Sequence, residues 1–168
     1  MTGLERLNAL PADEADAEMR RCCGSPEWAR RMAAARPFVS EEELLDAADA
    51  TWDALPPEEW LAAFRAHPRI GERKAERPQA GTAAWSAQEQ AGVGDADADT
   101  RAALAEANRA YEERFGWIFL VCATGRTAGE MLASARARLD NEPDDELRVA
   151  ADEQRRITRL RLEKLLTP

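Results

Sequence analysis

The chain has 168 residues, of which 45% are hydrophobic and 33% are charged. This size and balance exclude a disordered chain and fit one folded domain with a sizeable core. The 32 acidic residues against 23 lysines and arginines give a net charge of −9, which repels the phosphate backbone of nucleic acids. We therefore expect no nucleic-acid partner.

The composition also argues against several special classes of protein. The three cysteines, Cys22, Cys23 and Cys122, lack the spacing of a disulfide framework or a zinc site. With His67 as the only histidine and no clustered carboxylate motif, we expect no metal. The N-terminal region is acidic, unlike a signal peptide, and no apolar run approaches the roughly 20 residues that span a bilayer. We expect a cytoplasmic protein without membrane contact.

Hydrophobic spacing and helix-end residues predict helices along the first part of the chain. Asp13 is the expected N-cap of a helix that runs to residue 23. Ser25, followed by a proline and an acidic residue, opens the next helix. Ser40 with Glu43 forms a capping box before a helix with one apolar face.

The middle of the chain changes character twice. After a short helix that ends at His67, residues 72–84 are charged and without apolar periodicity, which indicates a surface loop. Helix recurs at residues 86–90 and pauses over residues 92–99. A long helix then runs from Thr100 and stops at a glycine.

The last third contains the one continuous apolar run. Residues 117–123 are too short and too rich in β-formers for a helix, which favours a buried extended or irregular segment. Thr127 with Glu130 forms a capping box, and the longest helix begins at about Asp144. The sequence predicts an all-α, single-domain multi-helix bundle of about seven to nine helices over residues 1–168.

His67 ends a helix directly before Pro68. Proline disfavours the helical conformation of the residue before it, so the imidazole should lie at a helix end. Histidine is the side chain that carries protons near neutral pH, but a lone histidine at a helix end is more often satisfied or solvated. Its position three residues after Phe64 directs it toward the core. Both interpretations stay open at this point.

Two other polar groups could form the wall of a pocket. The pattern of Ser86 and Glu89 is that of another capping box, although a helix N-terminus also presents N–H groups to an anion. Arg161 belongs to a row of arginines in the last helix, most of which should form a solvated face. Because Arg161 borders the apolar stripe, its guanidinium is suited to bind a carboxylate.

Five motifs along the chain point to one family. They are residues 66–71 (Ala-His-Pro-Arg-Ile-Gly), Ser86-x-x-Glu89-Gln90-x-Gly92, Asn108-x-x-Tyr111-x-x-x-Phe115-Gly116, Phe119-Leu120-Val121-Cys122-Ala123, and Ile157-x-x-Leu160-Arg161-Leu162. In this order they resemble the 2-oxo-4-hydroxy-4-carboxy-5-ureidoimidazoline (OHCU) decarboxylases of urate degradation, over roughly residues 7–166. The resemblance implies an all-helical, cofactor-free carboxy-lyase, usually a homodimer, that converts a small anionic ureidoimidazoline to (S)-allantoin and CO2.

The resemblance also assigns residues to roles. His67 matches the proton donor, and Glu89 matches a second catalytic residue. The residues that match substrate-binding positions are Pro68, Ser86, Gln90, Phe119, Leu120, Val121, Cys122, Ala123 and Arg161. One departure is visible, because the family commonly has Phe-Gly-Phe-Pro-Phe where residues 115–119 are Phe-Gly-Trp-Ile-Phe.

The implied chemistry fits this set of residues. Loss of CO2 leaves an electron pair that the C=N and C=O groups of the substrate can delocalise, so no cofactor is needed. We hypothesise that Arg161 or N–H groups near Ser86 orient the substrate, and that Glu89 pairs with His67 or with the ureido or hydroxyl group. His67 would then supply the proton that sets the S configuration.

Two alternatives remain open from the sequence alone. A helical domain of this kind could be a ligand- or partner-binding module without catalysis. It could also be a different cofactor-free lyase or hydrolase that acts on a related ureido compound.

Overall fold

The fold is helical throughout the part of the chain that the computed structural model describes, residues 1–71, 81–94 and 96–168. These ranges contain ten α-helices and no β-strand, which confirms the predicted all-α class. The helices are α1 (Gly3–Ala9), α2 (Ala12–Cys22), α3 (Pro26–Ala34), α4 (Glu41–Asp53), α5 (Pro57–Arg65), α6 (Ala83–Glu89), α7 (Ala91–Gly94), α8 (Ala98–Phe115), α9 (Ala128–Arg138) and α10 (Pro143–Leu166). The short α7 falls where a pause between helices was predicted. None of the described helices is both long and apolar enough to cross a membrane.

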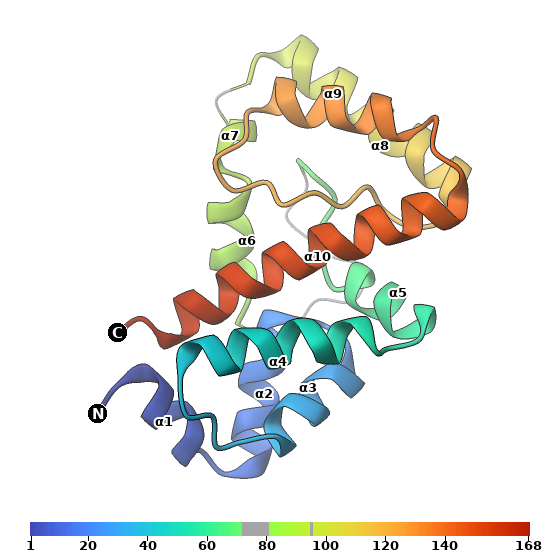
Figure 1. The fold of residues 1–168 in the computed structure, drawn as a ribbon. Coiled ribbons are helices and arrows are strands. Elements are labelled where there is room, and N and C mark those ends of the chain that lie inside the picture. Colours follow the sequence, from blue (N-terminus) through green and yellow to red (C-terminus); the bar gives the residue numbers. More distant parts are fainter. Residues whose placement is uncertain (72–80, 95) are drawn as a thin grey trace. The chain divides into compact units, whose positions relative to one another are not determined.

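The chain divides into two compact units, whose segments can be followed by colour in Figure 1. The first unit comprises Met1–Ala63 and Arg155–Pro168, and the second comprises Phe64–Gln154. The helices α5 and α10 contribute residues to both units. A single domain over residues 1–168 therefore stays a prediction.

The first unit packs α2 against α3 and α3 against α4 around buried aromatic and sulfur-containing side chains (Figure 1). Ser25 caps α3 as predicted, since its hydroxyl accepts from the N–H of Trp28 at 3.1 Å. The indole of Trp28 is fully buried and donates to the carbonyl of Ala48 on α4 at 3.1 Å. The apolar face predicted for the helix after Ser40 thus packs against α3.

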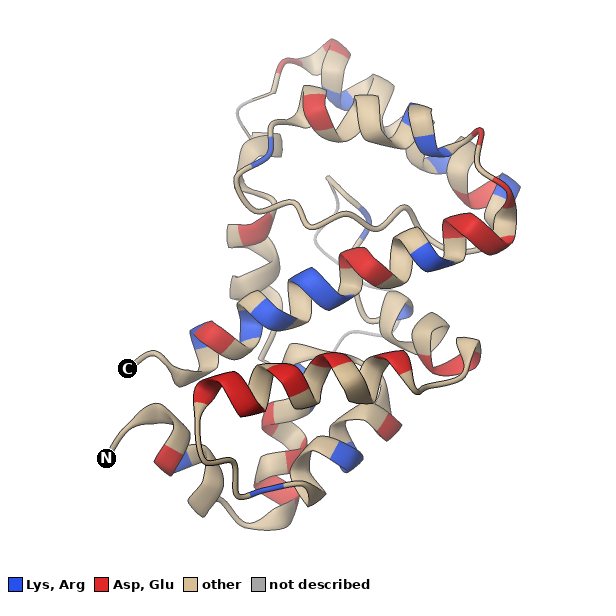
Figure 2. Ribbon diagram, in the orientation of Figure 1, with Lys and Arg blue, Asp and Glu red and all other residues tan. Residues whose placement is uncertain are grey.

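Ion pairs join α4 to the C-terminal part of α10, both in the first unit. Figure 2 shows the acidic residues along α4 and the basic residues along this part of α10. Arg155 pairs with Asp53, and Arg159 pairs with Asp49 at 3.2 Å. All four side chains stay at least one-third exposed. The prediction that most arginines of this row form a solvated face therefore needs a refinement, because these two contact α4.

Two predicted helix starts in the first unit differ from the structure. α2 begins at Ala12 with Pro11 as its N-cap, so the prediction of Asp13 as N-cap is wrong. Proline fixes the backbone at this position and lets the helix begin without a side-chain cap. Ser40 does cap α4, but the carboxylate of Glu43 accepts from Val39 rather than from the N-cap residue, so the capping box is only half formed.

The second unit is built on the helices α8 and α9, which run in the same direction side by side in Figure 1. Gly116 ends α8 in the left-handed conformation with φ of 84°, as the predicted helix stop requires. Residues 118–123 then run through the core without helix or strand, which decides the prediction of a buried extended or irregular segment in favour of the irregular one. Thr127 and Glu130 form both bonds of the predicted capping box at the start of α9.

A buried ionic cluster holds this crossing in place. We name it the Arg138 cluster; its members are Arg138, Glu146, Tyr111 and Trp117. Arg138 and Glu146 pair at 2.6 Å with side chains 8% and 0% exposed. The Tyr111 hydroxyl donates to Glu146 and accepts from the Trp117 indole at 3.0 Å. Arg138 also donates to the carbonyl of Leu120 at 2.7 Å, which ties the crossing to α9.

Burial raises the pKa of the Tyr111 phenol, against the opposing charge of Arg138, and the hydrogen bond to Glu146 adds to the rise. Burial acts to lower the pKa of Arg138, but its hydrogen bonds and electrostatic interactions with Glu146 and Tyr111 together outweigh burial, so this pKa is raised. The cluster therefore keeps an uncharged phenol next to a charged guanidinium.

Candidate active site

His67 lies just beyond the end of α5, as the proline after it predicts. Its N–H donates to the carbonyl of Phe64 at 3.1 Å, which closes the last turn. The imidazole is buried, with 7% exposure, and its Nε2 lies 2.7 Å from Oε1 of Gln154 on α10. The side chain is therefore directed into the second unit and is hydrogen-bonded there. A satisfied histidine can still carry a proton, so this contact does not exclude the functional interpretation.

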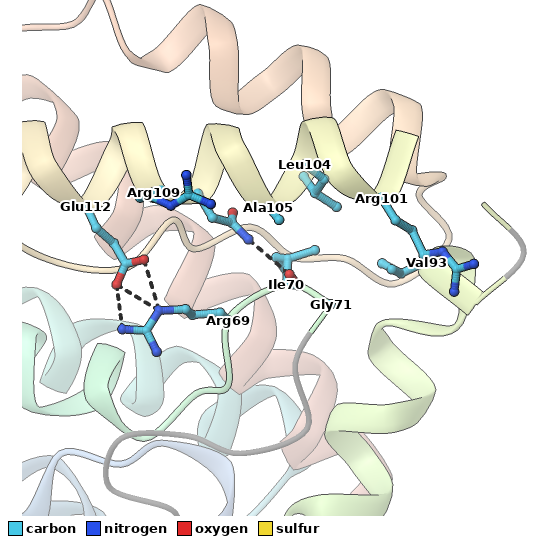
Figure 3. A pocket seen from close by; sticks show the side chains of 10 residues that line it. Arg69, Ile70, Gly71, Val93, Arg101, Leu104, Ala105, Arg109 and Glu112 are labelled. Atoms are coloured by element: carbon cyan, nitrogen blue, oxygen red, sulfur yellow. Dashed lines mark hydrogen bonds and ion pairs between the residues drawn. The ribbon is translucent and has the colours of Figure 1, made fainter. Parts of the chain in front are cut away.

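Three side chains hold the turn that follows His67. Arg69 pairs with both carboxylate oxygens of Glu112 at 2.9 Å (Figure 3). The amide of Asn108 donates to the carbonyl of Ile70 at 3.0 Å. The N–H of Gly71, a glycine with φ of 93°, donates to the side-chain oxygen of Gln90 at 2.8 Å. The turn is thus fixed to α8 on one side and to the end of α6 on the other.

α6 begins earlier than the sequence analysis predicted. Its first residue is Ala83 and its N-cap is Thr82, so Ser86 lies inside the helix and the predicted capping box with Glu89 is wrong. Alanines at positions 83, 84 and 87 favour helix and explain the earlier start. Of the predicted surface loop over residues 72–84, residues 72–80 lie outside the described part of the chain, and the last two residues are helical.

A pocket of about 730 Å³ lies beside α6 and α7 in the second unit. Three residues assigned to substrate binding line it: Pro68, Ser86 and Gln90. A second pocket of about 410 Å³ faces α8 and includes Arg69, Asn108 and Glu112 (Figure 3). The two pockets share Gly71, Val93 and Arg101 as wall residues.

Gly92 has a structural reason for its place in the motif. A β-carbon at this position would lie 2.2 Å from the carbonyl oxygen of Arg126, a backbone atom. Only glycine permits this close approach of α7 to the residues that precede α9. The contact fixes α7 to the second unit immediately after the polar residues of α6.

Cys122, in the apolar crossing, interacts electrostatically with Glu89 at the end of α6. Burial raises the pKa of this thiol, and the negative charges of Glu153 and Glu89 raise it further. Both carboxylates belong to largely buried residues, with 5% and 9% exposure respectively, and Glu153 pairs with Arg126 at 3.6 Å. The predicted catalytic Glu89 therefore lies within electrostatic reach of Phe119–Ala123, the predicted pocket segment.

Arg161 belongs to the first unit. It is buried, with 4% exposure, and donates to the carbonyl of Arg21 at 3.1 Å. Burial raises the pKa of Cys23 to about 12, and the positive charge of Arg161 acts in the opposite direction. The predicted position beside the apolar stripe is consistent with this burial, and the role in carboxylate binding stays a prediction.

The sequence analysis did not identify Gln154 or Glu153 as part of the site. A signal was available for Gln154, which lies three residues after Ala151 and three before Ile157. Both of these neighbours are apolar and share a helix face with Gln154. A polar residue on such a face needs a buried partner.

The fold and the site define a helical protein in which the residue after a buried imidazole lines a pocket suited to a small polar molecule. The comparisons narrow this class. Residues 8–163 match the family model described as OHCU decarboxylase. The uric acid degradation bifunctional protein TTL of Arabidopsis thaliana is 39% identical over 151 residues, which cover 89% of this chain and 47% of that protein. The chain thus spans about half of that relative's length.

Two further relatives match over most of their length. The 2-oxo-4-hydroxy-4-carboxy-5-ureidoimidazoline decarboxylase of Amia calva is 31% identical over 148 residues, covering 88% of this chain and 83% of that one. A crystal structure of OHCU decarboxylase in the presence of (S)-allantoin is 35% identical, covers 90% of this chain and 99% of that one, and superposes with a TM-score of 0.79. This chain belongs to the OHCU decarboxylase family.

Proposed function

We propose that this chain catalyses the cofactor-free decarboxylation of OHCU to (S)-allantoin and CO2 in urate degradation. One observation carries the proposal beyond family membership. The buried imidazole of His67 directly precedes Pro68, which lines the pocket of about 730 Å³ together with Ser86 and Gln90. A proton carrier therefore adjoins a pocket with hydroxyl and amide groups that can bind a ureido substrate.

The reaction requires only one proton from the protein. The bond between the ring and the carboxylate breaks, CO2 leaves, and the electron pair stays on the ring, where C=N and C=O groups delocalise it. A proton then forms the new C–H bond at the carbon that carries the ureido group. Delivery from one fixed side chain gives one configuration at that carbon.

In this proposal His67 donates the proton, and Glu89 acts on His67 or on the ureido or hydroxyl group of the substrate. Pro68, Ser86 and Gln90 bind the substrate from one side. We also assign the backbone of Phe119–Ala123 to substrate binding, an assignment that the electrostatic proximity of Glu89 to Cys122 supports.

Attraction of the anionic substrate has to be local, because the net charge of the chain is −9. We assign this role to Arg161, whose guanidinium can bind the carboxylate. We also propose that the enzyme is a cytoplasmic homodimer. Light scattering during size-exclusion chromatography would measure its mass in solution.

A coupled assay tests the proposed reaction. Urate oxidase and hydroxyisourate hydrolase generate OHCU in place, and circular dichroism follows (S)-allantoin after addition of the wild-type protein or of His67→Asn. We expect rapid growth of the (S)-allantoin signal with wild type, and a rate reduced about 10²- to 10⁴-fold with the variant. Racemic allantoin at the spontaneous rate with both proteins would contradict the proposal and favour a binding module without catalysis.

A further inference from the structure

Gln154 is a buried residue that none of the roles above uses. It is fully buried on α10, and its amide oxygen lies 2.7 Å from Nε2 of His67. The inference that follows depends on the proposed function. We propose that Gln154 is a positioning residue, which fixes a hydrogen on Nε2 of His67 and leaves Nδ1 as the atom that delivers the proton.

The hydrogen bond between the two side chains decides which ring nitrogen carries the hydrogen. An amide oxygen only accepts hydrogen bonds, so the imidazole nitrogen that faces it has to be the donor. Gln154 is fully buried, where a hydrogen bond donated to its amide oxygen contributes to stability. The favoured form of neutral His67 therefore carries its hydrogen on Nε2.

The hydrogen that His67 delivers to the substrate is the one on Nδ1. Protonated His67 carries hydrogens on both ring nitrogens, and the one on Nε2 is held by Gln154 throughout. The Nδ1–H bond breaks and its hydrogen forms the C–H bond with the electron pair that CO2 leaves behind. The product is neutral imidazole with its hydrogen on Nε2, which is the form that Gln154 accepts. A proton from solvent then restores the starting state.

Two contacts fix the orientation of the His67 ring. The backbone of His67 is fixed by its bond to Phe64 and by the proline that follows. The hydrogen bond to Gln154 restrains rotation of the imidazole ring, so the N–H bond at Nδ1 is held in one orientation. Orientation of this kind by a partner on the far nitrogen is the general way in which a catalytic imidazole is aligned.

Nitrogen-15 NMR tests the inference without any substrate, because the chain contains a single histidine. For wild type we expect a slowly exchanging ring hydrogen bonded to Nε2. It should vanish in Gln154→Leu and persist in Gln154→Glu, which keeps an acceptor oxygen. The control is Asp152→Asn, an exposed position on the same helix. A hydrogen on Nδ1 in the neutral wild-type protein, or an Nε2 hydrogen that survives in Gln154→Leu, would overturn the proposal.

Kinetics supply the second readout. We expect Gln154→Leu to lower kcat about tenfold, the size of effect expected for one lost hydrogen bond, while KM stays near its wild-type value. Gln154→Glu should restore most of kcat, which a purely structural role would not predict. Unchanged kcat in Gln154→Leu would overturn the proposal. If wild type shows no decarboxylation, the proposed function fails, while the NMR result still decides the position of the hydrogen. If Gln154→Leu does not fold, the wild-type spectrum and Gln154→Glu provide the test.

Discussion

The second unit contains two buried polar groupings of different chemistry, the Arg138 cluster and the contact between His67 and Gln154. In the Arg138 cluster, a guanidinium and a carboxylate face each other, and a phenol, an indole and a backbone carbonyl satisfy their remaining atoms. At the candidate active site, the imidazole of His67 contacts the neutral amide of Gln154 at 2.7 Å. The first arrangement fixes charges in place, whereas the second orients a group that can gain or lose a proton.

Within this unit, the Arg138 cluster contributes mainly to stability, whereas His67 contributes to the proposed reaction. A paired buried charge becomes costly as soon as its partner is removed, so the Arg138 cluster should dominate the stability of the second unit. The imidazole of His67 is instead the group whose protonation state changes in the proposed reaction, so its substitution should affect turnover more than stability. We therefore expect substitutions in the Arg138 cluster to lower stability more than turnover, and substitution of His67 to lower turnover more than stability.

The largest effect on stability should come from Glu146→Gln. It leaves Arg138 buried without its anionic partner, which typically costs about 3–5 kcal/mol. Urea unfolding would measure the loss, with Asp145→Asn as an exposed control on the same helix. Under conditions where the variant is still folded, its kcat should stay close to that of wild type. Equal stability of Glu146→Gln and wild type would contradict the structural role of the cluster.

Gly92→Ala should have the next largest effect. The added methyl would lie 2.2 Å from the carbonyl oxygen of Arg126, so the backbone has to move. We expect a loss of about 1–3 kcal/mol in the free energy of unfolding. Gly94→Ala is the matched control, because a β-carbon there meets no atom within 4 Å. The account fails here if both variants have the same stability.

A smaller effect is expected from Glu112→Gln, which weakens the pair that holds the turn after His67. Arg69 and Glu112 are 39% and 25% exposed, so solvent screens the pair and the loss should stay below about 1 kcal/mol. The neighbouring exposed Glu113→Gln serves as control. A loss as large as that of Glu146→Gln would mean that partly exposed and buried pairs are equivalent in this unit.

The smallest expected effect is the change in stability of Glu130→Gln at acidic pH. The N–H of Thr127 lowers the pKa of Glu130 below its ordinary value of 4.5. A lowered carboxyl pKa contributes stability above the unfolded value and loses it as the pH falls through the folded one. The stability advantage of wild type over Glu130→Gln should therefore be constant near neutrality and shrink below about pH 4.5. An advantage that grows in acid would have the wrong sign.

The sequence identified features that depend on neighbouring residues. Gly116, Ser25 and the Thr127–Glu130 box were correct because helix ends are decided within a few residues. The start of α6 was missed because Ser86 and Glu89 have the spacing of a capping box, yet the same spacing occurs inside helices.

The candidate site was only partly accessible from sequence. His67 could be singled out by its uniqueness and by the proline after it. Its partner Gln154 is 87 residues away, and no local pattern joins the two. The same holds for Glu89 and Glu153, which approach Cys122 from different helices. Long-range packing decides which buried polar groups meet, and packing is what a single sequence does not display.

The most direct test of the central claim compares turnover and stability in His67→Asn. Urea unfolding would give its folded fraction, and the coupled dichroism assay would give kcat for the folded protein. We expect a loss of at most about 1–2 kcal/mol in the free energy of unfolding, with kcat reduced at least about 100-fold. Wild-type turnover in the folded variant would contradict the assignment of His67 as the proton donor.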